Sequence, residues 1–291
     1  MEAEPEFKLN LLPFYQKCRS CSQYIIHYEE YEKDFYFRCP ICYSLTKWNF
    51  NTALKSSRLR LAQIETLLKL YIDQKSIQEA HYIMSEFSTK DKVNIHTISR
   101  YFAIFSGTAL KFYEGELQRT LLEGEIEIDE THLYKQKKTS APARPYANHS
   151  VWLFGLRQRN STKFVIIATN IRDSETLIPL IQKYIKIGST IYTDSYSVYV
   201  DNKNRASKLM QYGYVHYYVN HRVQFISPIS NKIHTNLIES LWKDIKQYIK
   251  KTRAISKYQF AIARYYFQKL LSKQEQSDLL VEELLHTMDI Q

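Results

Sequence analysis

Apolar residues recur at two different spacings along the chain, and the spacing changes near residue 120. Before that point they return every three or four positions, the period of an amphipathic helix. In 59–71 these positions are Leu61, Ile64, Leu67, Leu68 and Tyr71. Ser76 and Asn94 are suited to cap two further helices. Three short helices are compatible with a helix-turn-helix, and a general helical linker is the alternative.

After residue 120 the pattern predicts strands. Residues 125–129 alternate strictly between acidic and apolar, and Glu130 follows, which indicates a strand with one polar face. The runs 151–158, 163–169, 189–193 and 214–219 predict four more, and helices are expected over 173–187 and 236–251. The order β-β-β-α-β-α-β-α is that of a ribonuclease-H-like α/β fold with a mixed five-stranded sheet, in which an antiparallel meander precedes parallel strands.

That strand order brings acidic residues together. The first and fourth strands are neighbours at the middle of such a sheet, so Asp129 and Asp194 are expected within reach of a shared metal. On the helix from 236, one stripe is apolar and the other carries Glu239, Lys243, Lys246 and Lys250. The simpler reading is that Glu239 pairs with Lys243 at i+4, worth roughly 0.2–0.5 kcal/mol. Both interpretations hold together when no metal is bound.

The charge of the chain is concentrated in one region. The formal net charge is +10, yet residues 135–273 hold 24 basic and six acidic side chains, and 125–134 hold four acids and no base. The basic region is either an ordinary solvated surface or a channel for a polyanion beside metal-binding carboxylates. The six glycines exclude both G-x-G-x-x-G and the P-loop, so no nucleotide cofactor is expected.

Targeting signals and membrane spans are not predicted. The longest apolar runs are far shorter than the ~18 residues that a span needs. The first residues are acidic where a signal or transit peptide is basic. We therefore expect an intracellular, soluble protein.

All four cysteines fall in one short stretch. Cys18, Cys21, Cys39 and Cys42 form a C-x2-C-x17-C-x2-C pattern around a predicted hairpin over 24–28 and 35–38. Two such pairs close a tetrahedral zinc site, and four thiolates leave no position for a substrate, so the zinc would be structural. The alternative is two disulfides, which require an oxidising compartment. The sequence therefore predicts a zinc ribbon.

Four short motifs resemble a known family. They are Glu127-Ile-Asp-Glu-Thr-His, Gly188-Ser-Thr-Ile-Tyr-Thr-Asp194-Ser-Tyr, Val219-Asn-His221 and His234-Thr-Asn-x-Ile-Glu239-x-x-Trp242. With the zinc ribbon and helical segment ahead of them, they look like the DDE transposases of the Merlin superfamily and their bacterial ISXO-type insertion-sequence relatives, over about residues 15–270. The resemblance implies that Asp129, Asp194 and Glu239 are catalytic and bind Mg²⁺ or Mn²⁺.

The expected activity is DNA transposition. Two divalent ions held by three carboxylates would catalyse cleavage at a transposon end. They would then catalyse the attack of the freed 3′-hydroxyl on target DNA. One alternative is a domesticated transposase that binds DNA without cutting it, and another is a metal-dependent nuclease of the same fold.

Other residues are expected to contact double-stranded DNA, both the terminal inverted repeats and the target. They are Arg100, Lys135, Lys137, Lys138, His221, His234, Asn236, Lys243, Lys246 and Lys250. His221 and His234 contact the scissile phosphate or order the loop before the last helix. Asn236 is also expected to be the N-cap of that helix. Trp242 is expected to pack, with stacking on an unpaired base as the lesser reading.

Four segments divide the chain. We expect a zinc ribbon over 1–55, a helical DNA-binding segment over 56–118, a catalytic domain over 119–273 and an acidic C-terminal tail over 274–291. By analogy the protein would form a homo-oligomer on DNA. It would work in the nucleus of a eukaryotic host, or otherwise in the cytoplasm and nucleoid.

Overall fold

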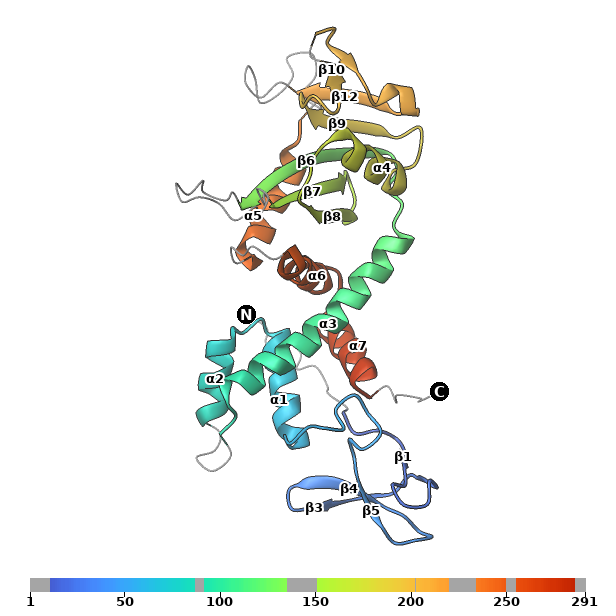
Figure 1. Ribbon diagram of the computed structural model, residues 1–291, viewed down its shortest axis with the longest axis vertical. Helices are drawn as coiled ribbons and strands as arrows, with labels where there is room; N and C mark the ends of the chain where they lie inside the picture. The colour runs from blue at the N-terminus through green and yellow to red at the C-terminus, as the bar shows by residue number, and fades with distance from the viewer. Residues whose placement is uncertain are drawn as a thin grey trace, which may run out of the picture. The chain divides into compact units, whose positions relative to one another are not determined.

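The structure is a computed structural model that describes residues 11–86, 92–134, 151–201, 203–219, 234–249 and 255–285 (Figure 1). The chain divides into two compact units. The N-terminal unit comprises Met1–Lys111 and Phe267–Gln291, and the sheet unit comprises Phe112–Tyr266. Across the described ranges, no helix combines the length and the apolar character that a membrane crossing requires.

The N-terminal unit begins with small antiparallel sheets. Strands β1 (Gln16–Lys17) and β2 (Tyr24–Ile25) pair with each other, and β3 (Tyr28–Tyr31), β4 (Asp34–Arg38) and β5 (Leu45–Lys47) form a second sheet. Trp48 is fully buried against them, and its indole Nε1 donates a hydrogen bond to Asp34 at 2.9 Å. A hairpin is therefore present in the predicted place, although its strands are 28–31 and 34–38.

Three helices follow in the order that the sequence predicts. They are α1 (Leu61–Ile72), α2 (Ile77–Glu86) and α3 (Ile95–Arg119), and α3 contributes residues to both units. At 25 residues, α3 is not the short helix that the sequence predicts. The Asn94 side chain accepts a hydrogen bond from the backbone of His96 at 2.8 Å, and Ser76 caps α2, so both predicted caps are confirmed. The Tyr71 ring packs edge-on against Phe102. Helices α1 and α3 therefore share an apolar core.

Much of the predicted acidic tail is a packed helix. Helix α7 (Lys273–Leu285) belongs to the N-terminal unit, and its Leu280 and Leu284 are fully buried. Lys273 pairs with Asp73 at 3.1 Å, next to the end of α1. Apolar residues four positions apart place one face of an otherwise acidic segment in the core.

The sheet unit is built on five strands in the order β12-β9-β6-β7-β8. They are β6 (Glu125–Tyr134), β7 (Val151–Gln158), β8 (Phe164–Thr169), β9 (Thr190–Asp194) and β12 (Val215–Val219). Strands β6, β7 and β8 form an antiparallel meander, whereas β9 is parallel to both β6 and β12. The sheet is mixed, as predicted, with β6 at its centre.

The connection from β9 to β12 differs from the expected helix. Its described residues form a short hairpin of β10 (Val200–Asp201) and β11 (Ala206–Ser207), followed by the 3₁₀ turn η1 (Met210–Tyr212). Tyr199 and Leu209, which flank the hairpin, are fully buried in the core of the sheet unit. The segment therefore buries its apolar residues without the long amphipathic stripe that a helix needs.

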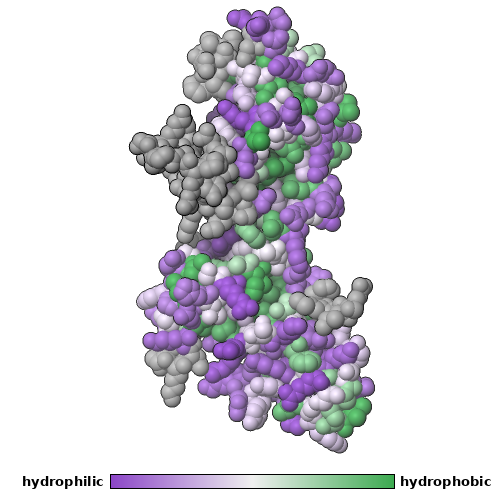
Figure 2. Space-filling model, viewed as in Figure 1, coloured by the Kyte–Doolittle hydropathy of each residue, from purple (hydrophilic) through white to green (hydrophobic). Residues whose placement is uncertain are grey.

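Helices cover both faces of the sheet (Figure 1). On one face Ile126 and Ile128 pack with α4 (Ser174–Tyr184) in the main core cluster. The other face is covered at β6 and β7 by α5 (Asn236–Tyr248), and Tyr266 of α6 (Ile255–Leu270) packs on Phe164 of β8. Hydrophilic side chains dominate the surface seen in Figure 2, with smaller apolar groups between them.

Candidate active site

Asp129 and Asp194 occupy equivalent positions on the two central parallel strands. The β6–β9 ladder pairs Glu125 with Thr190 and Glu127 with Tyr192. If this register is extended by two residues beyond the last pair, Asp129 on β6 stands opposite Asp194 on β9. Alternation places Asp129 on the face of Glu125 and Glu127 and away from the Ile126 core, as the sequence predicts. The two aspartates therefore lie just beyond the same end of the β6–β9 pairing.

Helix α5 brings Glu239 to the same face. Its apolar stripe is buried, with Ile238 and Ile245 fully enclosed and Trp242 only 5% exposed, whereas Glu239 is exposed. The indole Nε1 of Trp242 donates a hydrogen bond to Asp129 Oδ2 at 2.8 Å. Trp242 packs, as predicted, and it also ties the helix that carries Glu239 to the strand that carries Asp129.

A glycine makes this contact possible. Gly155 on β7 is the cross-strand partner of Asp129, and Trp242 lies directly on it. A Cβ added at Gly155 would overlap Trp242 Cη2 and lie 2.7 Å from Trp242 Cζ2 and 3.0 Å from Ile238 Cδ1. Because a residue with any side chain at this position would overlap Trp242, Gly155 sets the distance between α5 and the sheet.

We therefore expect Gly155→Ala to destabilise the sheet unit by roughly 1–3 kcal/mol, the usual cost of overpacking. The added methyl group displaces the Trp242 ring and weakens its hydrogen bond to Asp129. Urea denaturation followed by circular dichroism measures the free energy of unfolding. Gly115→Ala is the matched control, because Gly115 belongs to the same unit and its added Cβ would lie at an ordinary 3.9 Å from Arg119 Nη2. Equal stability of the two variants would contradict this packing.

The carboxylates influence one another electrostatically. Burial raises the pKa of Asp129 to about 6, the Trp242 hydrogen bond opposes this rise, and the negative charges of Asp194 and Glu239 add to it. Burial also raises the pKa of Glu130, on the opposite face of β6, to about 8 despite a hydrogen bond from Tyr199. Asp129 thus lies in the combined field of the other two predicted ligands, as a cation-binding position requires.

The three carboxylates do not form a closed cluster in this conformation. Within the ranges that the structure describes, only the four cysteines gather three or more potential ligand atoms within 4.8 Å of one another. Asp194 Oδ1 accepts a hydrogen bond from the backbone of Tyr196 at 2.9 Å, and Glu239 Oε1 accepts one from Thr235 at 3.4 Å. Asp194 and Glu239 therefore each keep a second carboxylate oxygen outside these hydrogen bonds.

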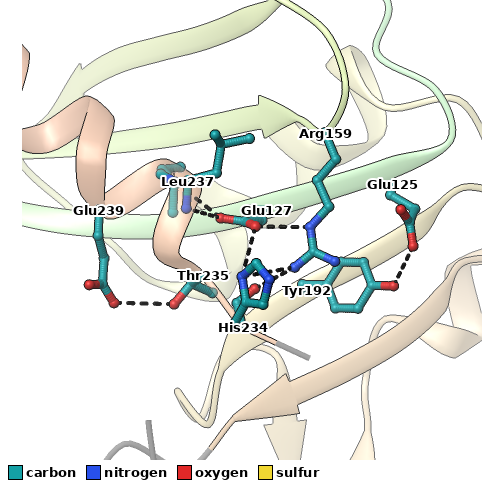
Figure 3. A network of polar contacts seen from close by, with 9 residues as sticks. Glu125, Glu127, Arg159, Tyr192, His234, Thr235, Leu237 and Glu239 are labelled. Carbon is teal, nitrogen blue, oxygen red and sulfur yellow. Dashed lines mark hydrogen bonds and ion pairs between the residues drawn. The ribbon is translucent and has the colours of Figure 1, made fainter. Parts of the chain in front are cut away.

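A polar network unforeseen from the sequence lies beside this site (Figure 3). The fully buried Glu127 carboxylate accepts hydrogen bonds from Arg159 Nε at 2.9 Å and from the backbone N–H groups of Leu237 and Ile238 at 2.9 and 3.0 Å. Asn236 was the expected N-cap of α5, but the N-cap is Thr235, whose side chain makes no capping hydrogen bond. The prediction fails because a carboxylate from β6 already satisfies these amides.

The predicted DNA contacts fall into two groups. Arg100, Asn236, Lys243 and Lys246 are exposed, and His234 is half-buried at the start of α5. Lys135, Lys137, Lys138, His221 and Lys250 lie outside the described residues. The exposed members on α5 therefore include two of the three predicted lysines of its polar stripe.

The four cysteines lie together in the N-terminal unit, and none forms a disulfide. Sulfur atoms of Cys18 and Cys42 are 3.5 Å apart, as are those of Cys21 and Cys39. That separation exceeds the ~2.05 Å of a disulfide and approaches the ~3.8 Å edge of a tetrahedron with Zn–S bonds of about 2.3 Å. The cluster is compatible with zinc binding. The Ser44 hydroxyl group lowers the pKa of Cys18 to about 5, whereas contacts with the neighbouring thiols raise the pKa of Cys21 to about 12, so the two thiols differ while no ion is bound.

Comparisons with known proteins point to one family. Residues 121–267 match the family model described as ISXO2-like transposase domain. None of the curated proteins matches the chain. Two similar solved structures are a simian T-cell lymphotropic virus intasome in complex with PP2A regulatory subunit B56 gamma and the Mos1 strand transfer complex.

Both structural likenesses are remote. The intasome chain shares 16% identity at a TM-score of 0.30, and the match covers 49% of each chain, so this protein spans about half of that chain's length. The Mos1 chain shares 8% identity at a TM-score of 0.30, over 76% of this chain and 93% of that one.

Proposed function

The chain belongs to the ISXO2-like transposase domain family, and on this premise we propose that it cuts transposon ends and joins the 3′-hydroxyl to target DNA. The observation that carries the proposal is the equivalent position of Asp129 and Asp194 on neighbouring parallel strands, with the helix of Glu239 packed beside them. Three carboxylates on rigid elements are the arrangement that metal-dependent phosphoryl transfer uses.

Asp129, Asp194 and Glu239 would hold divalent ions. The family implies metal use, and the donor set fits Mg²⁺ or Mn²⁺, because these ions prefer carboxylate oxygens. When bound, such ions lower the pKa of a water or 3′-hydroxyl nucleophile and stabilise the leaving oxygen. The protein orients the ligands: Trp242 fixes one oxygen of Asp129, and the backbone of Tyr196 fixes one oxygen of Asp194.

DNA would follow the basic region around this site. Lys243 and Lys246 project from the exposed side of α5 next to Glu239, where they suit phosphates of the strand being cut. Lys135, Lys137, Lys138, His221, His234, Asn236 and Lys250 are proposed to extend that contact. Such contacts carry little sequence information, so recognition of the transposon end is assigned elsewhere.

The N-terminal segments are proposed to recognise DNA ends. Residues 1–55 would form a zinc ribbon held by Cys18, Cys21, Cys39 and Cys42, and residues 56–118 a helix-turn-helix-like segment with Arg100 at the DNA. The ribonuclease-H-like catalytic domain would span 119–273, ahead of the acidic residues 274–291. A homo-oligomer would hold two ends together, in the nucleus if the host is a eukaryote.

A strand-joining assay tests the function. Purified protein is incubated with Mg²⁺ or Mn²⁺, a target plasmid and labelled DNA from the ends of its own element, and the products are separated by gel electrophoresis. We expect labelled ends joined to the plasmid, dependent on the added metal. Nicks without joined products would favour the nuclease, and binding without any product would favour a DNA-binding protein that has lost catalysis.

A further inference from the structure

An ion pair between the fully buried Glu127 on the central strand and the largely buried Arg159, which follows β7, lies against the start of the helix that carries Glu239 (Figure 3). We infer that Glu127 and Arg159 are positioning residues that fix α5, and thereby Glu239, against Asp129. This inference rests on the proposed function, because it concerns the geometry of the same three carboxylates. Neither residue is itself proposed to touch metal or DNA.

Glu127 holds the first turn of α5 directly. Its Oε2 accepts hydrogen bonds from the backbone N–H groups of Leu237 and Ile238, the two residues immediately before Glu239. First-turn amides have no partner within their own helix, and a negative charge there also complements the helix dipole. The backbone that leads into Glu239 is thus bonded to strand β6.

Arg159 supplies a second attachment on the other side of Thr235. Its Nε donates to Glu127 Oε1 at 2.9 Å, and its Nη2 donates to the carbonyl oxygen of His234 at 2.6 Å. The guanidinium also lies 3.7 Å from the centre of the Tyr192 ring on β9. One largely buried cation, with 11% of its side chain exposed, therefore connects the residue before the helix cap to the two strands that carry Asp129 and Asp194.

These contacts surround the proposed ligands on three elements. Glu127 is two residues before Asp129 on the same strand face, and Tyr192 is two residues before Asp194. A displacement of about 1 Å in a supporting element is enough to impair a catalytic site. Glu127 and Arg159 thus control where Glu239 stands relative to both aspartates, while Trp242 holds the next turn.

A purely structural role makes a different prediction. Buried ion pairs are frequently neutral or unfavourable for stability compared with apolar residues of similar size. If the pair served only stability, its loss would lower the free energy of unfolding without selectively changing metal affinity. A positioning role instead predicts weaker metal binding in a protein that remains folded.

The test compares Glu127→Gln with Glu125→Gln in the full-length, zinc-loaded protein. Glu125 is the matched control, because it lies two positions earlier on the same face but accepts its hydrogen bond from the Tyr192 hydroxyl at 2.7 Å instead of from α5. Hydrogen–deuterium exchange measures protection of amides 236–239, and calorimetric titration with Mn²⁺ measures affinity. A peptide from the middle of α5 reports whether the rest of the helix stays formed.

For Glu127→Gln we expect at least about tenfold faster exchange at amides 236–239 and about 10- to 100-fold weaker Mn²⁺ binding, the effect typical of groups that orient metal ligands. Glu125→Gln should change neither quantity. Arg159→Lys should weaken Mn²⁺ binding in the same direction, since it keeps the charge but loses the forked contact. In a Glu239→Gln background, Glu127→Gln should have no further effect on Mn²⁺ affinity.

Three results would overturn the inference: unchanged exchange and affinity in Glu127→Gln, equal losses in both glutamate variants, or unfolding of both Glu127→Gln and Arg159→Lys. Failure of the proposed function has a separate outcome. In that case the wild-type protein neither binds Mn²⁺ at this site nor joins DNA, while the exchange data still decide whether Glu127 holds α5. If Glu127→Gln leaves exchange at amides 236–239 unchanged, the attachment of α5 to Glu127 is refuted.

Discussion

Replacing Asp194 by Asn is expected to reduce strand joining by at least about 10³-fold, the scale seen when a group that stabilises phosphoryl-transfer charge is removed. The amide keeps the shape of the side chain and its hydrogen bond from the Tyr196 backbone, but it loses the negative charge that holds the ion. Asp129→Asn should have the same effect. The measured quantity is the initial rate of joined product at saturating Mg²⁺.

Asp201→Asn is the matched control, because Asp201 belongs to the same stretch of the sheet unit, and its carboxylate accepts hydrogen bonds from the backbone of Lys203 and the side chain of Asn204 in its own turn. It should join DNA at the wild-type rate. The Asp194 variant should still bind the labelled end and show an unchanged circular dichroism spectrum. Wild-type joining by Asp194→Asn would remove this residue from the catalytic site.

Zinc removal is expected to unfold the cysteine-containing module. Residues 11–55 contain only a few buried apolar side chains, and modules of that size rarely fold without a metal or a disulfide. Apparent zinc-binding free energies of about 10–16 kcal/mol are typical of such sites. The free energy lost with the metal should therefore exceed the free energy of unfolding of the module. A strong chelator, or Cys39→Ser, should therefore expose the buried Trp48 and shift its fluorescence to longer wavelength.

Ser20→Ala is the control for the zinc site, since Ser20 is exposed within the first cysteine pair and contacts Cys18 only through its backbone N–H group. It should retain one zinc per chain by elemental analysis and the wild-type spectrum. If the reduced, folded protein contains no zinc and its fluorescence ignores the chelator, the structural zinc site is refuted.

The sheet could be predicted because each strand shows its pattern locally. Acidic and apolar residues alternate over 125–129, and such a run predicts a strand without reference to any distant part of the chain. The order of elements then predicts that Asp129 and Asp194 lie on adjacent central strands, and the register of β6 and β9 agrees with this. The cysteine pairs are equally local, because their spacing alone suits a four-thiolate site.

The supporting contacts could not be predicted in this way. The hydrogen bonds from Leu237 and Ile238 reach Glu127 across more than 100 residues, and nothing local distinguishes Glu127 from Glu125 on the same face. Gly155 resembles any glycine in a strand until Trp242 is found on it. The sequence predicts Asn236 as the cap of α5, and this prediction is wrong for the same reason: a carboxylate from a distant strand replaces the local cap.

Crystals of the protein grown with a DNA end and Mn²⁺ would test the central claim most directly, through the anomalous signal of the ion. We predict Mn²⁺ bound directly by carboxylate oxygens of Asp129 and Asp194, with Glu239 drawn in to complete the site. Mn²⁺ bound elsewhere, or no bound ion beside these three carboxylates in a complex that joins DNA, would contradict the account.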